Sequence, residues 1–239
     1  MVDLSDLVDI SGSAFGVEAV ITLSPELVEL ARANLPPGWV DGPVSDDTLR
    51  WMALDARMVR AVCGRYDLDI AERAPGLAFI HAGAVAIDGR AVVLPGATMS
   101  GKTTLVGALI DAGATYLSDE YAAIDAEGRI LPFPRRMRVR DEDGAFHVRD
   151  IEVPPPGQTY ELALVARVPY ASEGWSVEDV GPGAAALLLI ENAVAAQTRT
   201  AEVLDNVTAA VKHGVALTGT RGEAADAAAE ILRLVAAQG

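Results

Sequence analysis

The sequence predicts an α/β protein with a mixed sheet, preceded by a small N-terminal α+β domain. From Ala78 onward, apolar runs typical of β-strands alternate with segments of helical periodicity. A glycine-rich turn stands between one such run and a helical segment, as in strand-loop-helix units. The first 75 residues instead mix short apolar runs with turn sequences such as Leu35-Pro36-Pro37-Gly38. We therefore expect a small domain over 1–75 and a larger one over 76–239.

The clearest pattern in the N-terminal domain is a helix from about Asp46 to Val62. Ser45 precedes it as an expected N-terminal cap, and the apolar residues that follow recur near helical spacing. No residue pattern in this domain indicates chemistry.

The larger domain opens with a predicted hairpin. The runs FIHAGAVAI and RAVVLPG are joined by Asp88-Gly89, a two-residue turn of the kind that closes antiparallel strands. Lys102 to Ala112 is expected to form a helix that ends at Gly113, and ATYLS at 114–118 a strand that completes a β-loop-α-β unit.

The remaining elements follow from similar patterns. A second hairpin is expected where AAID and RILPF flank Glu127-Gly128. Further strands are expected at 162–168 and 215–218, and helices at 183–196, 200–212 and 222–237.

Composition limits the partners and the compartment. A formal net charge of −15 repels nucleic acid and anionic lipid, so we expect neither as a partner. The longest apolar stretch, at 184–190, is too short to cross a bilayer, and the first ten residues lack the basic start of a secretory signal. Cys63 is the only cysteine and has no partner for an internal disulfide. A reduced, cytoplasmic setting is therefore expected, and we also expect a homo-oligomer.

The glycine-rich turn is a phosphate-binding motif. GATMSGKT at 96–103 matches GxxxxGK followed by Ser or Thr, after an apolar strand and at a helix start. Backbone N–H groups there would face phosphate oxygens, Lys102 would bridge the outer phosphates, and the Thr103 hydroxyl would ligate magnesium. We expect ATP and Mg²⁺ as cofactors, bound by the loop residues Gly96, Ala97, Thr98, Met99, Ser100, Gly101, Lys102, Thr103 and Thr104.

An acidic pair follows the predicted strand ATYLS. The carboxyl ends of parallel strands lie at one edge of a sheet, so Asp119 and Glu120 should face phosphates held by the loop. With Thr103, one acid could hold magnesium while the other accepts a proton from an attacking hydroxyl, and Asp119 is favoured as that base. The alternative is that both are ordinary exposed acids at a strand end.

Two further features have open alternatives. His81 begins the hairpin strand next to the one that feeds the loop, so it could lie near Asp119; a lone histidine at a strand start is more often structural. Within PRRMRVR at 134–140, strand alternation would place Arg136, Arg138 and Arg140 on one face. That face could bind an acidic peptide or a phosphate, or it could pair with the acids that follow it.

These residues together give the chain a resemblance to HPr kinase/phosphorylase and the wider HPr-kinase-like proteins, including tailoring kinases of lasso peptide clusters. The similar part runs from about Phe79 to Arg140, a quarter of the chain. It comprises HAGAVAIDGRAVVLPG, GATMSGKTT, and GATYLSDEYAAID followed by PFPRRMRVR. In that family a histidine lies fifteen residues before the first loop glycine, as His81 precedes Gly96, and an acidic pair begins seventeen residues after the lysine, as Asp119 follows Lys102.

The resemblance implies a fold like that of HPr kinase and of the nucleotide-binding core of phosphoenolpyruvate carboxykinases. It also implies roles: Asp119 as catalytic base with His81 as its neighbour, Lys102 as phosphate ligand and Thr103 as magnesium ligand. This chain departs from HPr kinase in having Thr103-Thr104 where Ser-Glu is usual, and Asp119-Glu120 where two aspartates are usual.

The function expected from the sequence is transfer of the γ-phosphate of ATP to a hydroxyl. The resemblance implies that the hydroxyl is a serine of a peptide or protein. The same residues would serve a small hydroxylated metabolite equally well, which is the first alternative. The second alternative is a nucleotide-sensing interaction protein with little turnover.

Overall fold

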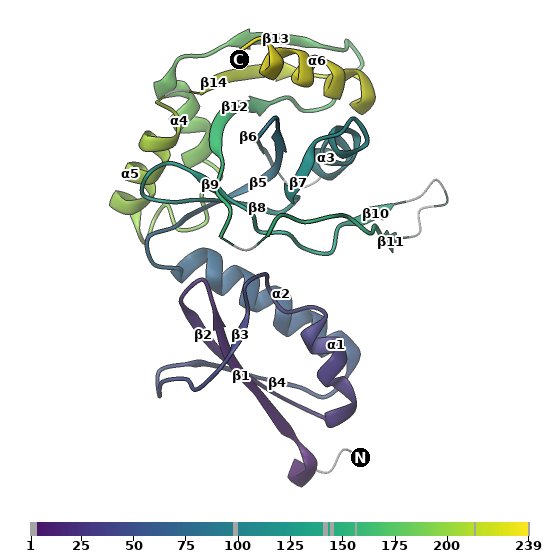
Figure 1. Ribbon diagram of the computed structural model, residues 1–239, viewed down its shortest axis with the longest axis vertical. Coiled ribbons are helices and arrows are strands. Elements are labelled where there is room, and N and C mark those ends of the chain that lie inside the picture. Colours follow the sequence, from purple (N-terminus) through teal and green to yellow (C-terminus); the bar gives the residue numbers. More distant parts are fainter. Residues whose placement is uncertain are drawn as a thin grey trace. The chain divides into compact units, whose positions relative to one another are not determined.

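The computed structural model describes residues 4–97, 100–140, 143, 146–155, 157–212 and 214–238. The chain divides into two compact units, Met1–Pro75 and Gly76–Gly239. Each combines a β-sheet with helices (Figure 1). The expected α/β class with a mixed sheet is therefore confirmed.

The first unit is built on a four-stranded sheet in the order β3-β1-β2-β4. The β1–β2 hairpin turns through Phe15 and Gly16, both with positive φ, and β4 runs parallel to β2. Its elements are the 3-10 turns η1 (Leu4–Asp6) and η2 (Pro25–Leu27), the helices α1 (Val28–Arg32) and α2 (Ala56–Arg73), and the strands β1 (Val8–Ala14), β2 (Val17–Leu23), β3 (Val40–Asp41) and β4 (Leu49–Ala53).

The predicted helix from Asp46 to Val62 is wrong in its first half. Leu49–Ala53 is the strand β4, in which exposed residues alternate with more buried ones, and helix α2 begins only at Ala56. Asp55 is the actual N-cap, since its side chain accepts a hydrogen bond of 2.7 Å from Met58 N. Ser45 instead donates to the Glu18 carboxylate. The apolar residues in this segment are spaced so that they satisfy both periods, and the Asp55 cap and pairing with β2 decide between them.

The second unit contains the predicted loop and the remaining elements. Its helices are α3 (Lys102–Asp111), α4 (Pro182–Ile190), α5 (Thr200–Ala210) and α6 (Ala224–Ala236). Its strands are β5 (Ala78–Ile87), β6 (Arg90–Pro95), β7 (Thr115–Ser118), β8 (Tyr121–Ile124), β9 (Ile130–Leu131), β10 (Arg138–Arg140), β11 (Phe146–Val148), β12 (Glu161–Arg167), β13 (Ser176–Asp179) and β14 (Val215–Thr220).

The main sheet has the order β13-β14-β12-β6-β5-β8-β9, with β7 also paired to β5. Strands β6, β12 and β14 are parallel, whereas β5 and β13 run antiparallel to their neighbours. Both predicted hairpins are confirmed: β5 and β6 join through Asp88-Gly89, with positive φ at both residues, and β8 pairs with β9. Positive φ at both central positions is the geometry that matches the twist of paired strands.

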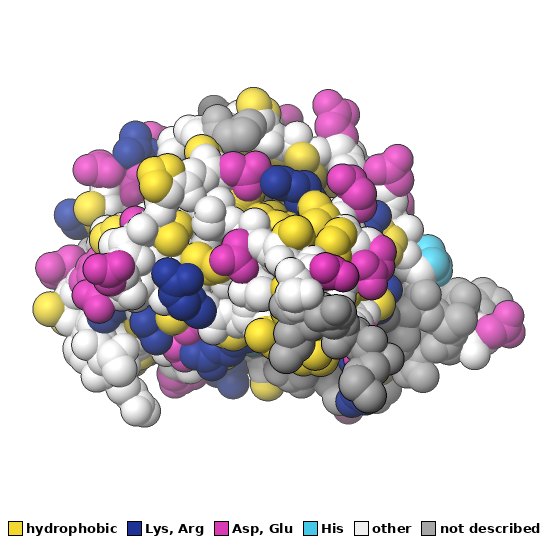
Figure 2. Space-filling model, turned by 90° about the horizontal axis from the view of Figure 1, so that it is seen from below, with side chains coloured by type: hydrophobic (Ala, Val, Ile, Leu, Met, Phe, Trp, Pro, Cys, Tyr) yellow, Lys and Arg dark blue, Asp and Glu magenta, His cyan; other side chains and the backbone are white. Residues whose placement is uncertain are grey.

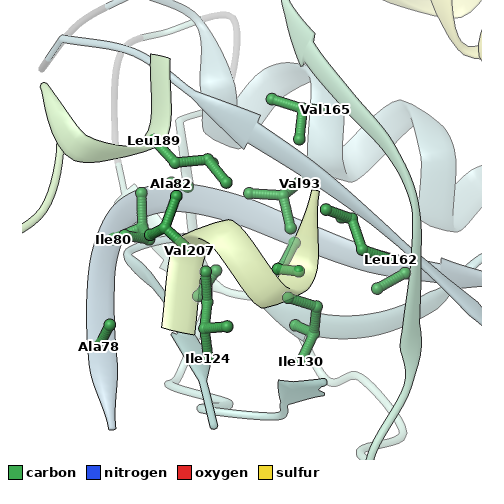
Figure 3. Packing of buried hydrophobic residues seen from close by; sticks show 14 of the residues in the cluster. Ala78, Ile80, Ala82, Val93, Ile124, Ile130, Leu162, Val165, Leu189 and Val207 are labelled. Carbon is green, nitrogen blue, oxygen red and sulfur yellow. The ribbon is translucent and has the colours of Figure 1, made fainter. Parts of the chain in front are cut away.

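Helices cover both faces of this sheet. Alternate residues of β5 and β6 point to opposite faces, so the residues of each strand divide between two apolar clusters. On one face they meet α4 and α5, as Figure 3 shows for Ile80, Ala82, Leu189 and Val207. On the other face they meet α3 and α6 (Figure 1). The sheet is thus fixed from both sides, and its strand ends carry the residues described next.

Among the described residues, no helix is both long enough and apolar enough to span a bilayer.

Candidate functional site

The glycine-rich loop leaves β6 after Pro95 and enters helix α3 at Lys102, where the sequence predicts it. Gly101 is the N-cap residue of α3 and has a φ of +84°. Its carbonyl oxygen accepts the first hydrogen bond of the helix, from Leu105 N. The positive φ favours glycine, and a Cβ at Gly101 would lie 2.5 Å from Arg221 Nη2, so the guanidinium would have to shift. Of the predicted loop residues, Thr98 and Met99 lie outside the described residues.

Helix α3 lies close to the sheet because β5 has a glycine beneath it. A Cβ at Gly83 would stand 2.6 Å from Cγ2 of Val106 in the helix. This close approach brings the first turn of α3, with Lys102 and Thr103, over the end of β6 and the middle of β5.

The Lys102 side chain folds back over the start of the loop. Its Nζ donates to the carbonyl oxygens of Gly96 at 2.7 Å and Ala97 at 2.9 Å, and lies 3.2 Å from His81 Nε2. Burial lowers the pKa of the ammonium group, and the carboxylates of Glu120 and Asp119 oppose that shift. The carbonyl oxygens of Gly96 and Ala97 therefore hold the ammonium group beside the start of the loop.

The acidic pair occupies an interruption between β7 and β8. Both strands pair with β5, and Asp119 and Glu120 fall between the last pair of one and the first pair of the other. The buried Ser118 hydroxyl accepts hydrogen bonds from the backbone N–H groups of Glu120 at 3.2 Å and Tyr121 at 3.1 Å. Ala82 N donates to Glu120 O at 3.1 Å. These bonds fix the backbone from which both carboxylates project.

The strand arrangement differs in one respect from the expected β-loop-α-β unit. Strands β6 and β7 run in the same direction, but they are not neighbours, because β5 lies antiparallel between them. Their carboxyl ends still lie at one edge of the sheet, so the loop and the acidic pair approach each other across a single strand.

Asp119 lies between the helix and the sheet. Its Oδ2 is 3.4 Å from the Thr103 hydroxyl, and its Oδ1 accepts a hydrogen bond of 2.8 Å from the Tyr116 hydroxyl. Tyr116 is buried, and burial raises its pKa well above the ordinary value, with the Asp119 charge acting in the same direction. The phenol therefore stays protonated and holds the carboxylate in one orientation.

The oxygen atoms at this point suit a magnesium ion. Mg²⁺ prefers oxygen ligands and is commonly held by one or two carboxylates together with substrate phosphates. The Thr103 hydroxyl and the Asp119 carboxylate offer such oxygens side by side, with Glu120 next in the chain. Across the described residues, no group of three or more His, Cys, Asp or Glu side chains is arranged to hold a metal ion.

His81 sits at the same edge, on β5, and contacts Lys102 rather than Asp119 in the part of the chain that the structure describes. Its Nδ1 lies 3.8 Å from the Glu120 carboxylate. Burial lowers the pKa of the imidazole, the Lys102 charge lowers it further, and Glu120 raises it. The ring is therefore neutral at pH 7, and the Nε2 that faces the Lys102 donors acts as an acceptor.

The predicted arginine face is not formed by one strand. Strand β10 spans only Arg138–Arg140 and pairs with β11, while Arg136 lies two residues before it and is exposed. The intervening Met137 is buried in the cluster that includes α3. The side chains of Arg138 and Arg140 lie outside the described residues.

A cationic pocket of about 130 Å³ adjoins the loop on the side away from Asp119. Its lining residues include Lys102, Arg167 and Arg221 and no acidic residue, although Arg167 lies 3.5 Å from the Glu191 carboxylate outside the lining. Acidic side chains are otherwise numerous, 34 against 19 basic ones, and are scattered over the face seen in Figure 2. The charged residues in the lining of this pocket are all basic, which in so acidic a chain favours an anionic ligand.

Three of these residues were not singled out from the sequence: Tyr116, Ser118 and Arg221. Tyr116 and Ser118 stand directly before the acidic pair on the same strand, and Arg221 directly follows β14. Their positions next to strand ends were visible in the sequence, but their contacts with Asp119, the 119–120 backbone and Gly101 were not.

Comparison with protein-family models finds no family that matches this chain. Comparison with curated proteins likewise finds no matching relative.

Replacing Ser118 with Ala should destabilise the second unit by about 1–3 kcal/mol, because two buried backbone N–H groups lose their acceptor. Urea denaturation would measure the loss. Thr115→Ala, an exposed change on the same strand, is the control and should shift stability by less than about 0.5 kcal/mol. Equal stability of the two variants would contradict the role given to Ser118.

Proposed function

We propose that this chain is an ATP-dependent kinase that transfers the γ-phosphate to a hydroxyl group, that of a serine in a peptide or protein. One observation carries the proposal: Lys102, Thr103 and Asp119 meet where β6 passes into α3, with His81 and Glu120 beside them. A purely structural glycine turn would not require a lysine, a hydroxyl and a carboxylate at the same point.

Each side chain has a part in the proposed transfer. Lys102 would exchange its loop carbonyls for phosphate oxygens and offset their charge as the γ-phosphoryl group moves. The Thr103 hydroxyl, with the Glu120 carboxylate next to Asp119, would hold magnesium, which would supply further positive charge to the phosphates. The Tyr116 hydroxyl would keep the Asp119 carboxylate oriented toward the incoming acceptor.

The reaction breaks one bond and forms one. The acceptor oxygen attacks the γ-phosphorus, the bond from that phosphorus to the β–γ bridging oxygen breaks, and ADP leaves. Asp119 takes the proton of the acceptor hydroxyl, so that the attacking oxygen does not carry it into the product. The neutral His81 ring and the Lys102 ammonium group lie beside this carboxylate pair.

The proposal includes the finer fold. The hairpin that enters the loop, with antiparallel β5 between β6 and β7, supports an HPr-kinase-like core rather than a sheet in which the two parallel strands are neighbours. The resemblance of residues 79–140 to that family is the support for serine as the acceptor.

Incubation with γ-labelled ATP and magnesium tests this function. The chain should transfer label to at least one member of a panel of serine-containing peptides, proteins and small hydroxylated metabolites, detected by mass spectrometry as an added phosphate. Label on a metabolite alone would replace the peptide acceptor with a small one. ATP binding with no transfer to any acceptor would favour a nucleotide sensor and contradict the kinase.

A further inference from the structure

The phosphate loop has two different sides. The carboxyl ends of the parallel strands β6, β12 and β14 lie at one edge of the sheet. Asp119 and Glu120 lie beyond β5 on one side of β6, whereas the cationic pocket lies on the other side, against the end of β12 and Arg221. A ligand on the loop is therefore flanked by carboxylates on one side and by cations on the other.

Arg221 is a buried cation in this pocket. It is 3% exposed, its Nη2 donates to Gly101 O at 3.1 Å, and its Nη1 donates to Gly222 O at 2.8 Å. Among the described residues, no carboxylate lies within ion-pair distance of its guanidinium. A buried charge whose contacts are neutral carbonyls is costly, and an anion in the pocket would offset that cost.

The surroundings of Arg221 also favour an anion beside its guanidinium. Burial lowers the pKa of the guanidinium, so the charged form is poorly solvated, and Glu223 and Tyr170 only partly oppose the shift. The Tyr170 ring lies 5.9 Å from the guanidinium carbon. An arginine offers a planar fork of N–H donors that matches phosphate oxygens. The hydrogen bonds to Gly101 O and Gly222 O use two of its five N–H groups.

We propose that the cationic pocket receives the α-phosphate and the ribose of the nucleotide, with Arg221 as the cation on the α-phosphate. The inference rests on the proposed function, which places a triphosphate on the loop. The reacting γ-phosphate must then lie beside Asp119, so the rest of the nucleotide extends to the opposite side of the loop, where the pocket lies. Its volume of about 130 Å³ is below the ~300–1,000 Å³ of pockets that enclose whole ligands, which fits one part of a nucleotide.

Calorimetric binding of ATP, ADP and pyrophosphate, each with magnesium, tests this assignment. Arg221→Gln should weaken ATP and ADP about tenfold or more, the effect of losing a charged hydrogen bond. Pyrophosphate, which lacks the α-phosphate and the ribose, should change by less than about threefold. Arg233→Gln is the matched control, since it removes the same charge from an exposed position on α6, and should leave all three affinities unchanged.

The possible outcomes separate the subsite from the function. If Arg221→Gln weakens pyrophosphate as much as ATP, Arg221 shapes the loop and the subsite is wrong; unchanged ATP affinity overturns it as well. If the parent chain binds neither ATP nor pyrophosphate, the proposed function itself fails. Should Arg221→Gln not fold, Arg167→Gln removes a half-exposed cation of the same pocket. An unchanged ratio of ATP to pyrophosphate affinity in that variant would overturn the subsite.

Discussion

Replacing Asp119 with Asn should lower phosphoryl transfer by ~10²–10⁴-fold, the usual contribution of a general base. The amide has the same size as the carboxylate and its oxygen can still accept the hydrogen bond from Tyr116, so the local geometry should persist. What is lost is the group that takes the acceptor proton. ATP affinity, measured by calorimetry, should stay within about threefold of the parent value.

Two further variants sharpen the test of Asp119. Asp111→Asn makes the same change at an exposed residue near the far end of α3 and should leave transfer intact. Glu120→Gln removes the neighbouring acid, whose carboxylate lies 3.8 Å from Nδ1 of His81. If Glu120→Gln abolished transfer and Asp119→Asn did not, the two acids would have to exchange roles. Transfer at the parental rate in Asp119→Asn would exclude it as the base.

Replacing Lys102 with Ala should weaken ATP binding by ~10- to 100-fold, because a charged hydrogen bond to phosphate contributes about 1.5–3 kcal/mol. The Lys102 ammonium group also donates hydrogen bonds to the carbonyl oxygens of Gly96 and Ala97. The substitution therefore removes these bonds within the loop as well as the contact with phosphate. Transfer should fall at least as far as binding.

The chain contains its own control for this change. Lys212 is the only other lysine in the sequence, and it is exposed just after α5. Lys212→Ala removes the same charge and should leave ATP affinity unchanged. Equal ATP affinity in the parent and in Lys102→Ala would contradict the assignment of the loop.

Local patterns were sufficient to predict the elements that carry the site, but not every element of the second unit: the helix expected at 183–196 ends at Ile190, and strand β13 was not predicted. The Asp88-Gly89 turn, the apolar runs beside it and the GKT triplet each depend on a few adjacent residues, and β5, β6 and α3 lie where those residues predict them. In the first unit, local patterns gave a wrong prediction. Leu49–Ala53 fits a helical pattern as well as a strand, and only pairing with β2 makes it a strand.

The sequence by itself determined that the loop from Gly96 and the pair Asp119-Glu120 follow strands, and that His81 lies on the strand paired with the one that enters the loop. Tertiary structure decided which of them touch. The insertion of antiparallel β5 between β6 and β7 sets Asp119 against Thr103 and His81 against Lys102. It also brought Arg221 to Gly101, from 120 positions further along the chain. Such contacts arise from sheet order and helix packing over long separations, which no local periodicity encodes.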